Sequence, residues 1–194
     1  ARHRARVRPG DSVLVVGVGG DGMNVVQGAR LAGAATIVAA DVVAHKLDWA
    51  RAFGATHTID AGREDLVAAV HALTDGVGVD HAFVCIDPPR TLLPAFRATA
   101  KAGNVVVTAL TPADELSLPV PPLELVTSQK AIMGSVYGFA SPRVQIPELV
   151  ALYRQSAIRL SELVTRRYPL DAINDGYADL IAGRNLRGVV LPFA

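Results

Sequence analysis

The sequence alternates short apolar runs with longer stretches of helical spacing, and this alternation constrains the fold more than any other feature. The apolar runs are rich in β-branched residues, and turn residues or a helix-like segment follow each of them. Strands that alternate with helices in this way form βαβ units, whose strands lie parallel in one sheet. We therefore predict an α/β fold with a doubly wound parallel sheet, the Rossmann fold. The expected strands of this sheet cover 12–16, 36–40, 57–60, 81–86, 105–109 and 131–137.

Helical spacing and turn residues set the other boundaries. Gly33 and Gly54 stand where left-handed residues commonly end a helix. The expected helices between the strands cover 23–32, 44–53, 64–73 and 91–100. After residue 137 the alternation of apolar runs and helical stretches is less regular. We expect helices there over 142–155 and 172–182, with short strands over 163–168 and 188–191. We divide the chain into a linker or solvated arm over 1–8, a nucleotide-binding domain over 9–137, and a C-terminal helix and strand segment over 138–194 that packs on it.

Composition excludes several classes of protein. The 194 residues are 51% hydrophobic and 19% charged, which is typical of a folded domain with a substantial core. The net charge is +1 without a clustered basic face, so we expect no nucleic-acid partner. No apolar run reaches the roughly 18–20 residues of a membrane span, and we expect no membrane association. The single cysteine, Cys85, excludes an internal disulfide, fits a cytoplasmic location, and is expected to be a buried core thiol in the fourth strand.

A glycine-rich turn follows the first expected strand. Gly17, Gly19 and Gly22 satisfy the pattern G-x-G-x-x-G, and Gly20 and Asp21 complete the loop. The first glycine permits a tight turn, the second lets the backbone approach a pyrophosphate, and the third lets the helix pack close to the sheet. The helix that begins here offers N–H groups and a positive dipole end to phosphates. By itself this pattern is weak evidence, because glycine-rich turns are common.

The position of Asp41 relative to the glycine turn favours dinucleotide binding. It ends the second expected strand, 19 residues after Gly22. At this spacing a carboxylate meets the hydroxyls of the adenosine ribose. A carboxylate would also repel a 2′-phosphate, so we predict NAD as the cofactor with at least about a tenfold preference over NADP. The alternative is a tight turn followed by a surface aspartate.

Several stretches together resemble the coenzyme domain of medium-chain alcohol dehydrogenases of the zinc-dependent type. The resemblance covers nearly the whole chain. The stretches that carry it are 9–20 (Pro-Gly-Asp-Ser-Val-Leu-Val-Val-Gly-Val-Gly-Gly), 28–34, 41–47, 53–56, 168–177 and 183–190 (Gly-Arg-Asn-Leu-Arg-Gly-Val-Val).

The resemblance implies further roles in cofactor binding. Lys46 matches a basic residue near the adenosine ribose, although a solvated helix lysine fits equally well. Arg187 matches an arginine that contacts the pyrophosphate, a task that suits the bidentate hydrogen bonding of a guanidinium. Backbone groups near Thr108, Ser135 and Tyr137 match positions that hold the nicotinamide carboxamide.

One residue departs from the family pattern. Asp21 stands where the family usually has valine, close to the nicotinamide side of the loop. Its carboxylate would repel the diphosphate and weaken NAD binding; alternatively it points to solvent and stabilises the start of the helix.

The resemblance also implies what lies outside this sequence. In the family an N-terminal domain supplies the zinc ligands, the proton relay and most of the substrate pocket, and the segment 138–194 would belong to that catalytic domain. We therefore expect no catalytic and no metal-binding residue here, and zinc only in the N-terminal domain. The full enzyme would transfer hydride between an alcohol or aldehyde and nicotinamide, as a homodimer joined through the strand 131–137. A non-catalytic NAD(H)-binding module and a zinc-free, NADPH-dependent reductase are the alternatives, and Asp41 disfavours the second.

Overall fold

Six parallel strands form the main sheet of the computed structural model, which describes residues 1–114 and 118–193. The strands are β1 (Ser12–Val16), β2 (Thr36–Asp41), β3 (His57–Asp60), β4 (Val79–Val84), β5 (Thr99–Val107) and β6 (Ala131–Gly134). Their order in the sheet is β3-β2-β1-β4-β5-β6, and each pair of neighbours is parallel. This is the order of a doubly wound dinucleotide-binding sheet, and it confirms the predicted fold.

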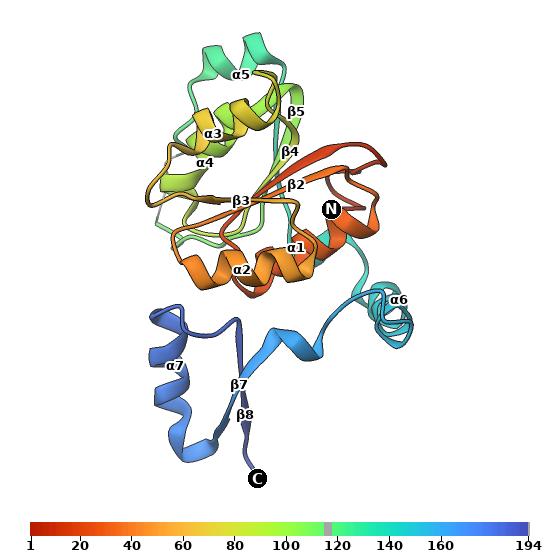
Figure 1. The fold of residues 1–194 in the computed structure, drawn as a ribbon, viewed down its shortest axis with the longest axis vertical. Helices are drawn as coiled ribbons and strands as arrows, with labels where there is room; N and C mark the ends of the chain where they lie inside the picture. The colour runs from red at the N-terminus through yellow and green to blue at the C-terminus, as the bar shows by residue number, and fades with distance from the viewer. Residues whose placement is uncertain (115–117, 194) are drawn as a thin grey trace. The chain divides into compact units, whose positions relative to one another are not determined.

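Helices cover both faces of this sheet (Figure 1). The helices α1 (Gly20–Leu31) and α2 (Ala44–Phe53) lie on one face, and α3 (Leu66–Leu73) and α4 (Pro88–Ala98) lie on the other. A short helix, α5 (Pro122–Ser128), precedes β6, where the sequence predicted no helix.

The sheet is buried from both sides, which explains why its strands read as continuous apolar runs. Alternate residues of β1 face opposite layers. Leu14 and Val16 belong to the core cluster that contains Leu92 and Phe96 of α4, and Val13 is fully buried on the other face. Burial of a Leu or Phe side chain contributes about 1.5–3 kcal/mol, so this packing holds the strand ends in place.

Several bounds differ from the prediction. β5 begins at Thr99 instead of residue 105 and ends at Val107 instead of 109, so it replaces the end of the helix expected over 91–100, which stops at Ala98. β4 ends at Val84 instead of residue 86, so Cys85 lies just after the strand and is half-buried rather than a core thiol within it. The chain turns there because Asp87 has a φ of 40° and Pro88 begins α4. β6 ends at Gly134 instead of residue 137, because Tyr137 adopts a left-handed φ of 48°.

The first residues are not entirely the solvated arm that their alternating arginines indicated. Ala5 and Val7 are buried, and the guanidinium of Arg4 lies 4.3 Å from the centre of the Phe139 ring. The apolar residues between the arginines therefore join the packed part of the chain. The alternation of charged and apolar residues at the N-terminus could have indicated that the apolar residues are buried.

The chain divides into two compact units, 1–145 and 146–194. A helix, α6 (Pro142–Arg154), crosses the division in sequence. In the second unit β7 (Val164–Pro169) pairs in parallel with β8 (Arg187–Leu191), and α7 (Ile173–Ile181) connects them. Short 3₁₀ turns cover Tyr137–Phe139, Ser161–Leu163 and Leu170–Ala172.

A buried carboxylate organises the second unit. Asp179 of α7 accepts hydrogen bonds from the hydroxyl of Tyr168 and from Nε of Arg184, each at 2.6 Å, and it pairs with Arg166. These hydrogen bonds, that of Tyr168 first, lower the pKa of Asp179 to about 2. The carboxylate is therefore ionised at neutral pH and joins α7 to β7.

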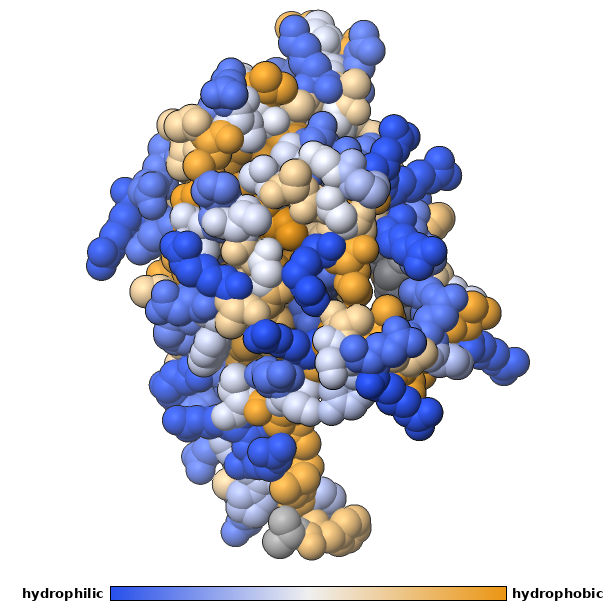
Figure 2. Space-filling model, turned by 45° about the vertical axis from the view of Figure 1, so that its right-hand side comes forward, coloured by the Kyte–Doolittle hydropathy of each residue, from blue (hydrophilic) through white to orange (hydrophobic). Residues whose placement is uncertain are grey.

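No helix in the described part of the chain is long and apolar enough to cross a membrane. On the face drawn in Figure 2, hydrophobic side chains (orange) reach the surface between hydrophilic ones (blue). Many of the exposed apolar side chains belong to α6, where they are Val144, Ile146, Leu149, Val150 and Tyr153.

Candidate cofactor site

The order of the strands creates a switch point at the carboxyl ends of β1 and β4. These two strands are neighbours, but the chain leaves β1 toward β2 and leaves β4 toward β5, on opposite sides. Ligands of open α/β sheets bind outside the carboxyl ends of the strands at such a point. The predicted glycine turn follows β1 at this place, and Cys85, Ile86 and Asp87 follow β4.

The three glycines of the motif have different tasks. Gly17 has a φ of +84°, and a Cβ there would lie 2.4 Å from the side chain of Ile86. A Cβ at Gly22 would lie 2.0 Å from the carbonyl oxygen of Gly17, so α1 can approach the turn only without a side chain at this position. A Cβ at Gly19 would meet nothing within 4 Å. Gly17 and Gly22 are therefore required by the fold, whereas Gly19 borders open space.

The first N–H groups of α1 face the same turn. Gly19 is the N-cap of this helix, and among the described residues no side chain caps it. Gly20 begins the helix, and Asp21 stands in its first turn with an exposed side chain. An uncapped helix start beside open space is a ready binding site for an anion, because unpaired N–H groups and the helix dipole both favour negative charge.

Asp41 connects β2 to the glycine turn. Its Oδ2 accepts a hydrogen bond from the Val18 N–H at 2.9 Å, and its Oδ1 accepts one from the Val43 N–H at 3.0 Å. The residue is only 8% exposed. A carboxylate has about four acceptor positions, so about two remain for the hydroxyls of a ribose. The structural role of Asp41 in holding the turn was missed by sequence reasoning, because it depends on the approach of residues 23 apart in sequence.

The structure places most of the other predicted residues along the same edge of the sheet. Lys46 lies in the first turn of α2 and is half-buried. Thr108 follows β5, and its N–H donates to the Val84 carbonyl at 3.0 Å. Ser135 follows β6, and its N–H donates to the Val107 carbonyl at 2.9 Å. Because these two N–H groups already bond to neighbouring strands, only other backbone atoms near Thr108 and Ser135 remain for a carboxamide.

Two of the predicted residues, Tyr137 and Arg187, do not directly follow a strand of the main sheet. Tyr137 is exposed in the 3₁₀ turn after β6. Arg187 begins β8 in the second unit, and its side chain is exposed. Its contact with a pyrophosphate stays a prediction.

Sequence reasoning missed two apolar residues at the carboxyl edge of the sheet. Val42 follows β2 with 67% exposure, and Ile86 follows β4 with 49% exposure. Such side chains offer apolar surface to a flat ring. Both could have been predicted as site residues, because each comes immediately after a strand of a doubly wound sheet.

Cys85 directly follows β4, next to Ile86. Burial raises the pKa of its thiol to about 11, the charge of Asp21 raises it further, and a hydrogen bond with Thr108 opposes the shift. The thiol is therefore protonated at neutral pH, and it is not an activated nucleophile.

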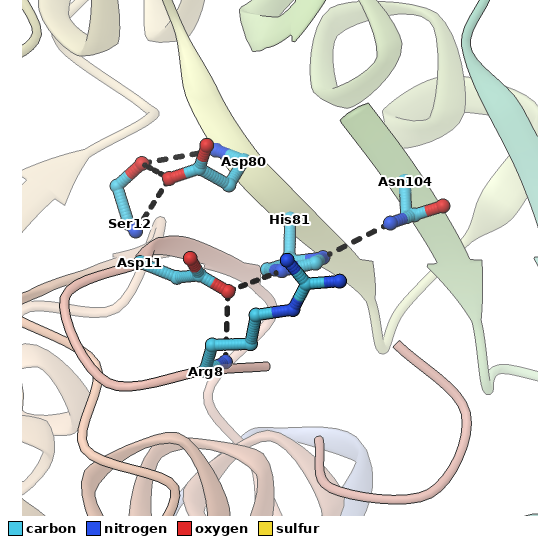
Figure 3. A network of polar contacts seen from close by, with 6 residues as sticks. All are labelled: Arg8, Asp11, Ser12, Asp80, His81 and Asn104. Atoms are coloured by element: carbon cyan, nitrogen blue, oxygen red, sulfur yellow. Dashed lines mark hydrogen bonds and ion pairs between the residues drawn. The ribbon is translucent and has the colours of Figure 1, made fainter. Parts of the chain in front are cut away.

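The opposite edge of the sheet holds a second polar cluster (Figure 3). Asp11 accepts a hydrogen bond from the Arg8 N–H at 2.8 Å, and His81 Nε2 lies 2.9 Å from the same carboxylate oxygen. Asn104 contacts the other ring nitrogen of His81. Partial burial raises the pKa of Asp11, but the bonds from Arg8 and His81 outweigh it, and the net pKa is lowered.

Ser12 and Asp80 extend this cluster. The N–H and the hydroxyl of Ser12 donate to Asp80 at 2.8 and 2.6 Å, and the Asp80 N–H returns a bond to the Ser12 hydroxyl at 2.9 Å. These contacts join the starts of β1 and β4. Their polar groups satisfy one another, so they stabilise the sheet.

No metal centre is present in the described ranges 1–114 and 118–193. No three side chains of His, Cys, Asp or Glu gather there in a group that could hold an ion. The described residues therefore offer no zinc site of their own.

Comparison with known proteins identifies the family. Residues 20–155 match the model of the zinc-binding dehydrogenases. The chain is 38% identical over 193 residues to the NDMA-dependent alcohol dehydrogenase of Amycolatopsis methanolica, an alignment that covers 98% of this chain and 52% of that protein.

Solved structures agree with this match. An alcohol dehydrogenase zinc-binding domain protein from Burkholderia ambifaria superposes with a TM-score of 0.91 at 34% identity, over 98% of this chain and 51% of that one. A zinc-binding dehydrogenase from Sinorhizobium meliloti, solved bound to NADP, superposes with a TM-score of 0.86 at 28% identity, over 97% and 54%.

The chain thus spans about half the length of the relatives it matches. The sheet order, the glycine turn and these matches agree with the resemblance seen in the sequence. The chain belongs to the zinc-binding dehydrogenase family and corresponds to its C-terminal NAD-binding domain.

Proposed function

We propose that this chain binds NAD(H) with the diphosphate against Gly19 and the start of α1 and the adenosine ribose against Asp41. The observation that carries the proposal is the open space at Gly19, beside an uncapped helix start and next to a carboxylate with unused acceptor positions. Lys46 would lie near the ribose, and Val42, which follows Asp41 at the end of β2, would contact the adenine.

The cofactor is NAD in preference to NADP. A 2′-phosphate would have to lie beside the Asp41 carboxylate, which is held in place by two backbone N–H groups and cannot easily turn away. Like charges about 4 Å apart repel by about 4 kcal/mol at an effective dielectric constant of about 20, before screening by salt. The NADP found in the Sinorhizobium meliloti protein belongs to that protein.

In the longer protein, the chain would serve hydride transfer between an alcohol or aldehyde and nicotinamide. The nicotinamide ring, when bound, supplies the hydride chemistry. The residues of this chain bind and orient it: Thr108, Ser135 and Tyr137 through backbone atoms, and Arg187 through the pyrophosphate. A stand-alone NAD(H)-binding module is the second candidate.

We further propose a homodimer in a cytoplasmic setting. Among the described residues, β6 is an edge strand, paired to β5 on one side only. An exposed edge is a liability that pairing with a second copy removes. A monomer in sedimentation equilibrium at micromolar concentration would contradict the dimer. The cytoplasmic setting depends on the lone cysteine, Cys85.

The substitution Gly19→Ala tests the binding site with little effect on the fold. The added methyl group has nothing within 4 Å, and the φ of Gly19 is −75°, which alanine adopts freely. It would occupy the space against which the diphosphate packs. Calorimetric titration with NADH should show affinity reduced by at least about tenfold, with an unchanged unfolding midpoint.

Gly28→Ala, within the same helix, is the matched control. Its methyl group makes an ordinary contact at 3.4 Å, and it should leave NADH affinity unchanged. If Gly19→Ala binds NADH as well as Gly28→Ala does, the proposed position of the diphosphate is wrong.

A further inference from the structure

Asp60 ends β3, beside the strand end that carries Asp41. The two residues are partners in the parallel register of β2 and β3, and the Ala61 N–H donates to the Asp41 carbonyl at 3.1 Å. The residues before them, Ala40 and Ile59, belong to the core cluster that α4 covers. Because side chains alternate along a strand, Asp41 and Asp60 both leave the carboxyl edge of the sheet on the other face.

The Asp60 carboxylate lies close to Val42, the residue that would contact the adenine. A Cβ at Gly62 would lie 3.2 Å from Asp60 Oδ1 and 3.7 Å from Val42 Cβ, so both groups lie within 4 Å of one point. Val42 is 67% exposed, and a base packed on it would have the turn after β3 at its edge. The carboxylate of Asp60 is therefore the charged acceptor beside the base in the proposed binding mode.

One oxygen of this carboxylate is held in place and the other keeps spare capacity. Oδ1 accepts a hydrogen bond from the Gly62 N–H at 3.0 Å. Oδ2 lies 3.4 Å from Nε of Arg63, whose side chain is 85% exposed, and such an exposed ion pair is weak. Because an ionised carboxylate has about four acceptor positions and no donor, Oδ2 can accept another hydrogen bond but cannot give one.

This chemistry distinguishes purine bases. Adenine carries an amino group at position 6, which donates hydrogen bonds, whereas hypoxanthine and guanine carry an oxygen there, which only accepts them. An acceptor beside an amino group gains a hydrogen bond, but beside a second acceptor it loses its water without replacement.

We infer that Asp60 is a specificity-determining residue that accepts a hydrogen bond from the 6-amino group of the adenine and so selects adenine dinucleotides over 6-oxopurine dinucleotides. This inference rests on the proposed function, because it requires the adenine to lie against Val42. It assigns a second recognition task to the strand ends, because Asp41 meets the ribose and Asp60 meets the base.

The test compares NADH with nicotinamide hypoxanthine dinucleotide in its reduced form, which differs from NADH by the oxygen at position 6. Calorimetry on the 194-residue chain should give a dissociation constant about tenfold higher for the hypoxanthine dinucleotide. In Asp60→Asn the amide oxygen can still accept from the Gly62 N–H, while the amide nitrogen replaces Oδ2 and donates. The ratio of the two constants should therefore fall by at least about tenfold, with an unchanged unfolding midpoint.

Glu64→Gln is the matched control. Glu64 is an exposed carboxylate in the same turn, and its Oε1 accepts from the Asp60 N–H at 3.3 Å. The glutamine removes one negative charge but keeps an acceptor, so the ratio should stay as in the wild type. If Glu64→Gln lowers the ratio as much as Asp60→Asn does, the preference comes from the general charge of the turn and the inference is wrong.

The wild type alone also decides. If it binds both dinucleotides with the same affinity, Asp60 does not recognise the base, whereas the proposed function stands. If it binds neither dinucleotide at millimolar concentration, the proposed function fails and the inference fails with it.

Discussion

The two edges of the parallel sheet use polar groups in opposite ways. At the amino edge, Asp11, His81, Ser12 and Asp80 bond to one another and to backbone N–H groups. At the carboxyl edge, the start of α1 has no side-chain cap among the described residues. Both edges belong to the same sheet and join the same strands, β1 and β4.

This difference separates stabilising groups from binding groups. A polar group whose bonds are made within the protein contributes to folding and has little left for a ligand. A group that keeps spare capacity beside open space, such as the α1 N-terminus at Gly19, can bind one. Asp41 does both, because two of its acceptor positions hold the turn and the others face outward to a ligand in our proposal.

The largest expected effect is that of Gly22→Ala. The added Cβ would lie 2.0 Å from the Gly17 carbonyl oxygen, so α1 and the turn must separate. We expect a loss of about 3 kcal/mol in the free energy of unfolding, measured with urea, and no detectable NADH binding. Unchanged stability together with unchanged binding would show that the close approach of α1 is unimportant.

The next effect is confined to the amino edge. Asp11→Ala removes the acceptor of the Arg8 N–H and leaves the buried His81 ring without its carboxylate. We expect the free energy of unfolding to fall by about 1–3 kcal/mol. NADH affinity should stay the same. A loss of affinity measured by calorimetry would contradict the claim that the amino edge stabilises the fold and only the carboxyl edge binds the cofactor.

A smaller effect is expected on cofactor choice at the carboxyl edge. Asp41→Asn removes the charge that opposes a 2′-phosphate but keeps an acceptor oxygen for one backbone N–H. The ratio of the NADPH and NADH dissociation constants should fall by about tenfold. Fluorescence titration measures both constants, and equal affinity of the wild type for the two cofactors would contradict the role assigned to Asp41.

The smallest effect is a dependence on pH. The folded pKa of Asp11 is lowered, so its contribution to stability is complete above the unfolded pKa of about 3.9 and is lost as the pH falls toward the folded pKa. The stability difference between the wild type and Asp11→Asn should therefore shrink below about pH 4. Urea midpoints at a series of pH values measure this, and a difference that grows toward low pH would reverse the assignment.

Features that depend on local spacing could be predicted from the sequence. The glycine turn and Asp41 follow from residue types at fixed intervals, and the alternation of strands and helices gave the sheet. The Asp11–His81 and Val18–Asp41 contacts could not be predicted, because they join residues 70 and 23 apart that only the folded sheet brings together. Strand ends such as Val84 depend on backbone turns at Asp87 and Pro88, which apolar periodicity does not report.

The most direct test is to follow backbone amide resonances by NMR while the chain is titrated with NADH. The account predicts that the amides of Gly20, Asp21 and Gly22 shift strongly, whereas those of Arg8, Ser12 and Asp80 stay in place. Shifts confined to the amino edge, or no shifts at millimolar NADH, would contradict the claim that the carboxyl edge is the binding edge of this sheet.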